Sequence, residues 1–176
     1  MIDFSQDYFS LFGLPARYDI DSRALDAAYR ALQASVHPDR HASAGEAQRR
    51  MALQSSARVN EAYRTLKSPV DRAQYLLRLQ GVDALSETDT ALPNDFLEYQ
   101  LERREAIEEA REANDARRLD ALLTDVRTEV DELTHVLADE LRDARALEAA
   151  RGTVRKLKFL SKVAADIDAA SADMEP

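Results

Sequence analysis

Residues that interrupt helices are scarce in this chain, which has four Gly and five Pro among 176 residues. The stretches between them are rich in Ala, Leu, Arg, Asp and Glu, and most of these residue types favour helices. Because Gly and Pro are the strongest helix breakers, long helices are free to form between them. The sequence therefore predicts an all-α protein.

Four helices are predicted in the first part of the chain, because apolar residues recur there with helical spacing. These helices are expected over residues 8–12, 22–36, 45–67 and 69–79. Gly13 and Gly81 are placed to end the first and the fourth, and Asp21 or Ser22 is placed to cap the second. The second and third helices are expected to lie antiparallel, with Leu53 among the residues in the core between them.

Three longer helices are predicted after a segment that lacks sustained periodicity. This segment, residues 81–93, mixes Ser, Thr, Asp and Gly, and we interpret it as a linker between domains 1–80 and 94–176. Beyond it the three helices should close as a small antiparallel bundle, with turns at residues 114–115 and near Asp143. Gly152 falls inside the last helix, where close helix approach is the favoured explanation.

Charge is distributed unevenly and excludes several classes of function. Residues 1–76 carry 10 Arg/Lys and 9 Asp/Glu, whereas residues 77–176 carry the remaining 14 and 24. An acidic chain is repelled by phosphate backbones, so no nucleic-acid partner is expected. No apolar run reaches membrane-spanning length and the N-terminus lacks the features of a signal peptide, so we expect a cytoplasmic protein with no membrane partner.

Metal and cofactor sites are not expected. The chain has no Cys, which excludes disulfides and thiolate ligands. His41 and His135 have no clustered second ligand, and the sequence has no Gly-rich phosphate-binding loop. We therefore expect no metal, no cofactor and no catalytic residue.

His37, Pro38 and Asp39 form the most informative short motif. Pro38 fixes its own φ and disfavours a helical conformation at His37, so the preceding helix should end here with both polar side chains projecting outward. Taken alone, the triplet is an ordinary helix stop with an exposed His and Asp. Its flanks change that interpretation.

The flanking motifs occur in the order and spacing of a known domain. They are residues 28–32 (AYRAL), 37–40 (HPDR), 60–66 (NEAYRTL), 68–69 (SP) and 71–75 (DRAQY). With them, the first part resembles a J-domain, the module that stimulates ATP hydrolysis by DnaK-type chaperones. This resemblance implies an N-terminal four-helix J-domain whose chaperone-binding residues are His37, Pro38, Asp39, Arg30 and Arg40.

The resemblance extends over nearly the whole chain. Residues 7–15 (DYFSLFGLP) and 153–160 (TVRKLKFL) are similar to HscB, the J-type co-chaperone family of iron-sulfur cluster assembly. Members join a J-domain to a C-terminal three-helix domain that binds an IscU-type scaffold, and they deliver that scaffold to an HscA-type chaperone. Ala31 and Ser35 depart from general J-domains, which often carry basic residues at these positions, so a weaker electrostatic contribution to chaperone binding is expected.

Apolar residues that miss the buried stripe point to a binding surface on the C-terminal domain. Phe159 lies roughly 160° from Leu157 on a helical wheel and should be exposed. On the first helix of this domain Phe96, Tyr99, Ile107 and Ala110 define the expected buried direction, and Leu97 and Leu101 sit to one side of it. The resemblance implies that Leu97, Leu101 and Phe159 bind the scaffold, with Glu102 and Glu105 as partners for its basic residues. Packing of this apolar strip against the J-domain is the alternative.

The sequence thus predicts a co-chaperone that binds an IscU-type scaffold, delivers it to an HscA/DnaK-type chaperone and stimulates that chaperone's ATPase. It predicts an activator of a partner enzyme and no enzyme activity of its own. One alternative keeps the fold and makes the chain a J-domain adaptor for a different client. A further alternative is a helical interaction protein with no role in chaperone activation.

Overall fold

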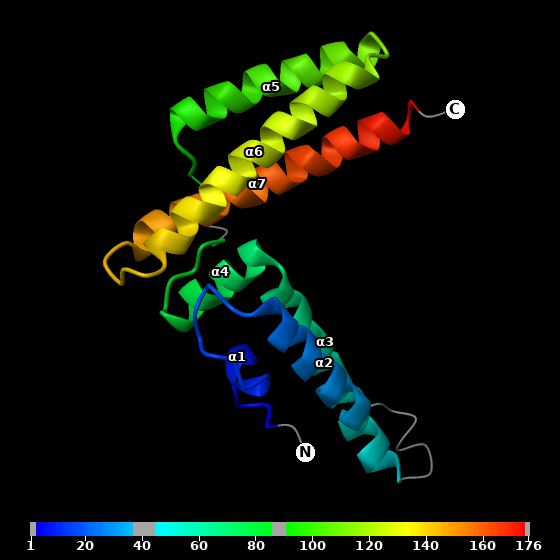
Figure 1. The fold of residues 1–176 in the computed structure, drawn as a ribbon, viewed down its shortest axis with the longest axis vertical. Helices are drawn as coiled ribbons and strands as arrows, with labels where there is room; N and C mark the ends of the chain where they lie inside the picture. The colour runs from blue at the N-terminus through cyan, green and yellow to red at the C-terminus, as the bar shows by residue number, and fades with distance from the viewer. Residues whose placement is uncertain (1–2, 37–44, 86–90, 175–176) are drawn as a thin grey trace. The chain divides into compact units, whose positions relative to one another are not determined.

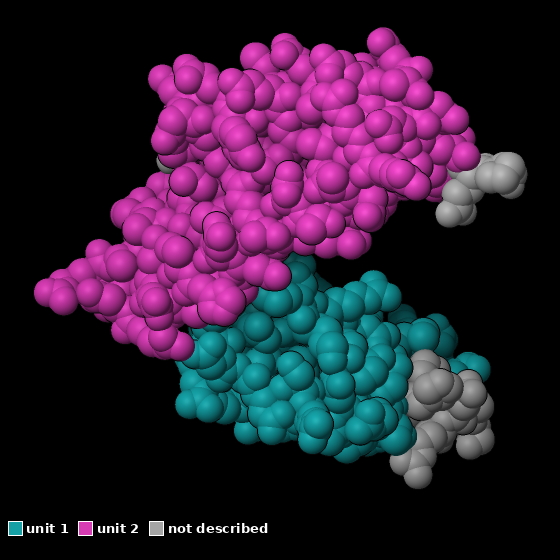
Figure 2. Space-filling model, turned by 45° about the horizontal axis from the view of Figure 1, so that its top comes forward, with its two compact units in different colours: residues 1–76 teal, residues 77–176 magenta. Residues whose placement is uncertain are grey.

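The computed structural model describes residues 3–36, 45–85 and 91–174. All regular secondary structure in these ranges is helical (Figure 1), which confirms the predicted all-α class. The chain divides into two compact units, residues 1–76 and 77–176 (Figure 2).

Unit 1 is built on an antiparallel pair of helices. Its elements are α1 (Tyr8–Leu11), α2 (Ser22–Val36), α3 (Glu46–Lys67) and most of α4 (Pro69–Leu79). Helices α2 and α3 lie side by side in opposite directions (Figure 1). Both bounds of each of these four helices agree with the predicted ranges to within one residue.

The ends of the first two helices follow from local chemistry. The Asp7 side chain caps α1 by accepting hydrogen bonds from the backbone N–H groups of Phe9 and Ser10, and Asp21 does the same for α2 at Arg23 (2.8 Å) and Ala24 (3.3 Å). Gly13 has a φ of +66°, a conformation that costs Gly little. It lets the Leu14 N–H donate back to the Phe9 carbonyl at 2.9 Å, which closes α1.

The core of unit 1 differs from the sequence prediction at one position. Val59 and Leu66 are fully buried as expected, but Leu53 is 57% exposed. The buried face of α3 in this region is made of small residues, Ala52 and Ser56. At 100° per residue Leu53 lies about 80° from their mean direction, on the flank of that face. Small residues at the contact let α2 and α3 approach closely. The apolar character of Leu53 therefore did not predict its burial.

Unit 2 contains the three long helices α5 (Asn94–Glu112), α6 (Ala116–Glu140) and α7 (Leu147–Ala172). Helices α6 and α7 lie side by side for most of their length, and α5 packs along the same bundle (Figure 1). The core joins all three helices through Phe96, Ala110, Leu119, Leu123, Val126, Leu160, Ile167 and Ala170. The predicted order and number of helices in this unit agree with the structure.

The turns of unit 2 lie where the sequence places them. Asn114 adopts a positive φ of 51°, which Asn tolerates better than most residues, and the Asp115 side chain then caps α6 by accepting from the Arg118 N–H at 3.0 Å. Residues 141–146 separate α6 from α7. Helix α5 begins at Asn94, which follows the predicted linker directly. Asn94 and Asp95 have side chains suited to capping a helix, but the N-cap is Pro93 and no side chain caps α5.

The predicted linker, residues 81–93, falls within unit 2, since the division between units lies in α4. Gly81 ends α4 with a φ of +80°. The carbonyl of Ala84 accepts a hydrogen bond from Arg155 Nε of α7 at 2.9 Å, so this part of the segment is fastened to the bundle. Residues 86–90 lie outside the described ranges, and the domain boundaries given above stay a prediction.

Candidate functional site

Helix α2 leads up to the predicted chaperone-binding motif. Val36 is both the last residue of α2 and the last described residue before the motif, and α3 begins at Glu46. Residues 37–40, which contain His37, Pro38, Asp39 and Arg40, lie outside the described ranges. Arg30 is exposed on α2, less than two turns before the helix ends.

Two tyrosines join α2 to α3 close to Arg30. The rings of Tyr29 and Tyr63 stack with centroids 4.0 Å apart, and the Tyr29 hydroxyl donates to Asn60 Oδ1 at 2.9 Å. Aromatic stacking of this kind adds to the burial of the rings. The helix that carries Arg30 is therefore held against α3 by residues of the same motifs that carry the resemblance.

Asp26 is a second connection between the two helices. Its carboxylate accepts hydrogen bonds from Lys67 Nζ at 2.7 Å and from the Tyr63 hydroxyl at 3.0 Å. The hydrogen bond from Lys67 is the main cause that lowers the pKa of Asp26 below its ordinary value, and the Tyr63 bond adds to it. The same bond raises the pKa of Lys67. The charged forms of both groups are thus favoured in the folded protein.

The C-terminal candidate surface is formed by side chains from α5 and α7. Leu97 and Leu101 of α5 are 42% and 59% exposed, as their spacing predicts, and Phe159 of α7 is 36% exposed. Glu102 and Glu105 are exposed on α5. At 100° per residue Glu105 lies about 40° from Leu101 and extends its strip, whereas Glu102 lies about 100° around the helix.

Phe159 projects toward α5 and is partly covered by it. Its ring packs edge-on against Phe96, with centroids 5.7 Å apart and an angle of 77° between the planes. The helical wheel correctly placed Phe159 away from the main buried stripe of α7, but α5 lies along that flank. Phe159 is therefore the point where the α7 side of the surface meets α5, the helix that carries Leu97 and Leu101.

The buried face of α5 is more polar than the sequence suggested. Tyr99 was expected inside and is 52% exposed, whereas Gln100 and Arg103 are 4% and 5% exposed. Arg103 donates to Gln100 Oε1 and to Glu129 Oε2 of α6, both at 2.7 Å, and its guanidinium lies 4.7 Å from the centroid of the Tyr99 ring. These contacts satisfy the buried charge, which is the condition for placing an Arg inside.

A regular spacing could have revealed that buried face. Positions 96, 100, 103, 107 and 110 follow the spacing of a single helical face. Two of the five, Gln100 and Arg103, are polar. The prediction considered only apolar residues, so it assigned Tyr99 to the buried face instead. The structure shows that helical periodicity was the better signal.

Comparisons with known proteins agree with both units. Residues 7–75 match the family model of the DnaJ domain, and residues 92–168 match that of the HSCB C-terminal oligomerisation domain. The co-chaperone protein HscB homolog of Cupriavidus taiwanensis is 52% identical over 160 residues, covering 91% of this chain and 90% of that protein. The chain belongs to the HscB family of J-domain co-chaperones. The HscB homolog of Azoarcus sp. strain BH72 is 48% identical over 174 residues, covering 99% and 98%.

Solved HscB structures share the fold. Chaperone HscB from Vibrio cholerae superposes with a TM-score of 0.85 at 36% identity, covering 97% of this chain and all of that one. The human co-chaperone protein HscB gives a TM-score of 0.88 at 27% identity, covering 96% and 83%. An N-terminal J-domain followed by an HscB C-terminal domain, as the resemblance implied, is therefore the architecture of this HscB-family chain.

In the part of the chain that the structure describes, no helix is both long enough and apolar enough to cross a membrane. Within the same residues, no group of three or more His, Cys, Asp or Glu side chains is arranged to hold a metal ion.

Proposed function

We propose that this HscB-family chain binds an IscU-type iron-sulfur scaffold, delivers it to an HscA/DnaK-type chaperone in the cytoplasm and stimulates that chaperone's ATPase. Family membership supports the co-chaperone role. The observation that carries the scaffold-binding part is the exposure of Leu97 and Leu101 on adjacent turns of α5. The cluster is cargo on the scaffold, and this chain acts as an activator of a partner enzyme.

The chaperone end of the mechanism uses the motif after α2. His37, Pro38 and Asp39 dock on the ATPase lobe and favour the conformation that hydrolyses nucleotide. Asp39 accepts charge-assisted hydrogen bonds from a chaperone Arg, worth about 1.5 to 3 kcal/mol when desolvated. Arg30 and Arg40 add contacts with acidic groups beside the turn. The stacked and hydrogen-bonded α2–α3 pair supplies a stiff base for this contact.

The scaffold end of the mechanism uses apolar burial with a charged border. Covering the exposed parts of Leu97 and Leu101 contributes about 1 kcal/mol each, since roughly half of each side chain is available. Phe159 adds an aromatic contact at the edge of α5. Glu102 and Glu105 pair with basic groups of the scaffold, which orients the complex more than it tightens it.

Scaffold binding is tested by replacing the two leucines. We expect Leu97→Ser combined with Leu101→Ser to weaken binding of the matching IscU-type scaffold about tenfold or more, because the lost apolar contacts amount to 2 kcal/mol or so. Isothermal titration calorimetry with the full chain measures this affinity. Val136→Ser is the matched control, because Val136 is 46% exposed on α6 and should leave the affinity unchanged.

Unchanged affinity in the double variant would contradict scaffold binding through this surface. If the scaffold fails to bind even the parent chain while the chaperone's ATPase is still stimulated, the chain is instead an adaptor for a different client.

A further inference from the structure

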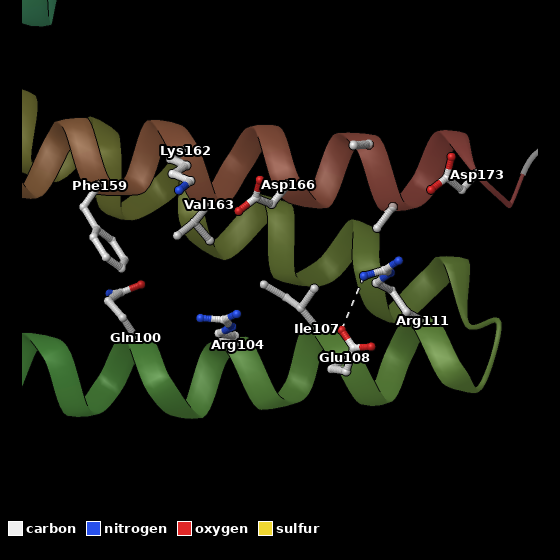
Figure 3. A pocket seen from close by; sticks show the side chains of 12 residues that line it. Gln100, Arg104, Ile107, Glu108, Arg111, Phe159, Lys162, Val163, Asp166 and Asp173 are labelled. Atoms are coloured by element: carbon white, nitrogen blue, oxygen red, sulfur yellow. Dashed lines mark hydrogen bonds and ion pairs between the residues drawn. The ribbon is translucent and has the colours of Figure 1, made fainter.

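A groove runs between α5 and α7 and ends at Phe159 (Figure 3). Its volume is about 460 Å³, and its walls mix apolar and charged side chains. Ile107 and Val163 form part of its apolar lining, and Arg104, Lys162 and Asp166 are among its charged residues. This mixture suits a segment of a protein partner better than a purely apolar ligand.

A buried amide at the Phe159 end of the groove has a free donor. Arg103 Nη1 donates to Gln100 Oε1 at 2.7 Å, and Arg has donors only, so this bond fixes which way the Gln100 amide points. Gln100 Nε2 is then left buried, with no acceptor among the described residues. Figure 3 shows the Gln100 amide and the Phe159 ring pointing toward one another across the groove. A buried donor without a partner is uncommon and calls for an acceptor.

Two cations approach the same end of the groove from opposite walls. Arg104 projects from α5 and Lys162 from α7 (Figure 3), and neither forms an ion pair with another described residue. Asp166, one turn beyond Lys162 on α7, is likewise unpaired within the described ranges. Farther along, Arg111 is already paired with Glu108 at 3.4 Å. Near Phe159 and Gln100 the described lining therefore has two unpaired cations, Arg104 and Lys162, against one unpaired carboxylate, Asp166, a net charge of +1.

We infer that this end of the groove is a subsite for an acidic side chain of the scaffold. The inference rests on the proposed function, because Phe159 belongs both to the groove and to the scaffold-binding surface. A partner that covers Phe159 reaches the groove, and a small change of the Phe159 rotamer, common at interfaces, opens the Gln100 amide to it. The incoming carboxylate accepts from Gln100 Nε2 and lies between Arg104 and Lys162.

This subsite gives the complex a defined orientation. Glu102 and Glu105 face basic groups of the scaffold, whereas Arg104 and Lys162 face an acidic one. The scaffold must then present opposite charges on the two sides of its apolar patch. A partner with the reverse arrangement meets like charges on both sides and is rejected.

The test compares scaffold affinities of the full chain and two variants by calorimetry. In the first variant, Arg104→Gln is combined with Lys162→Gln. In the second, Gln100→Glu keeps an acceptor for Arg103 and replaces the free donor with an oxygen that repels a carboxylate. We expect each to weaken binding of the matching scaffold about tenfold, the effect of losing charge-assisted contacts. Arg117→Gln, which removes an exposed charge of α6 outside the groove, should stay within about twofold of the parent.

A double-mutant cycle identifies the acidic residue. Each Asp or Glu of the scaffold is changed to Asn or Gln in turn, and one change should weaken binding to the parent chain but not to the Arg104→Gln/Lys162→Gln variant. Thermal unfolding checks that the variants fold. If Gln100→Glu is unfolded, the Arg104→Gln/Lys162→Gln variant decides alone.

The outcomes separate this inference from the proposed function. Parental affinity in both groove variants, with binding weakened about tenfold or more by Leu97→Ser combined with Leu101→Ser, would overturn the acidic subsite and leave scaffold binding intact. Parental affinity in the leucine variant would overturn both. Self-association of the parent chain that is lost in the groove variants, with scaffold affinity unchanged, would assign the groove to a second copy of this chain and overturn the inference.

Discussion

Asp26 makes the α2–α3 pair sensitive to acid. Its pKa is lowered by the hydrogen bond from Lys67 and then by that from Tyr63. A carboxyl group whose pKa is lower in the folded than in the unfolded protein stabilises the fold above its unfolded pKa. That contribution is lost as the pH falls through the folded pKa. The affected range therefore begins below about pH 4.

We therefore predict that the free energy of unfolding depends less on pH in the Asp26→Asn variant than in the parent chain. The free energy of unfolding of the parent chain should fall as the pH drops below about 4, and the variant should lose part of that slope. Urea denaturation at a series of pH values measures it. The pKa of Asp143 is also lowered, mainly by the side-chain hydrogen bond from Arg145. The free energy of unfolding of the Asp26→Asn variant should therefore still depend on pH to some extent.

The control is Asp125→Asn, which changes an exposed carboxylate of α6. Equal acid slopes for the parent and Asp26→Asn would contradict the role assigned to the Lys67 and Tyr63 contacts.

At the residue scale, the exposure of a side chain was predictable where its position on the helical wheel lay clearly away from the buried face. Leu97 and Leu101 are examples, and their exposure agrees with the structure. Gln100 and Arg103 could not be placed inside from polarity, because their burial depends on Glu129, a partner 26 residues from Arg103. Their positions follow from spacing and long-range pairing together.

At the scale of the element, the glycine that follows α4 and the glycine within α7 have different roles. Gly81 has a φ of +80°, whereas Gly152 lies inside α7, and a Cβ added to Gly152 would meet no atom within 4 Å. The prediction that Gly152 permits close helix approach is therefore wrong. Nothing in its surroundings requires Gly.

Opposite effects on stability are expected from the two Gly→Ala changes. Gly152→Ala should raise the free energy of unfolding by about 0.5 to 1 kcal/mol, because Ala has the higher helix propensity. Gly81→Ala should lower it by about 1 kcal/mol, because Ala is strained at positive φ. Chemical denaturation of both variants gives the two values. A loss of stability in Gly152→Ala would show that the residue serves packing after all.

Helix ends were the most predictable feature at this scale. Gly13, Pro69 and Asp115 act locally, so their effects on α1, α4 and α6 can be read without knowing the rest of the fold. The start of α5 was less predictable, because Pro93, Asn94 and Asp95 all suit a helix N-terminus and the sequence does not choose between them.

At the scale of the whole molecule, the two units differ in charge. Unit 1 carries 10 basic and 9 acidic residues, a net of +1, and unit 2 carries 14 and 24, a net of −10. The acidic unit attracts a basic partner at a distance, while the near-neutral unit gains little from long-range steering. This division fits a chain that presents one partner to another.

The central claim is that one chain couples scaffold capture to activation of a chaperone. The most direct test is steady-state ATP hydrolysis by the matching HscA-type chaperone, with this chain and the IscU-type scaffold added singly and together. Stimulation by the two together should exceed the sum of their separate effects, by about tenfold if the coupling is of ordinary size. His37→Gln should lose the stimulation, and Leu97→Ser with Leu101→Ser should lose only its dependence on the scaffold. Stimulation that is indifferent to the scaffold, or that survives in His37→Gln, would contradict the claim.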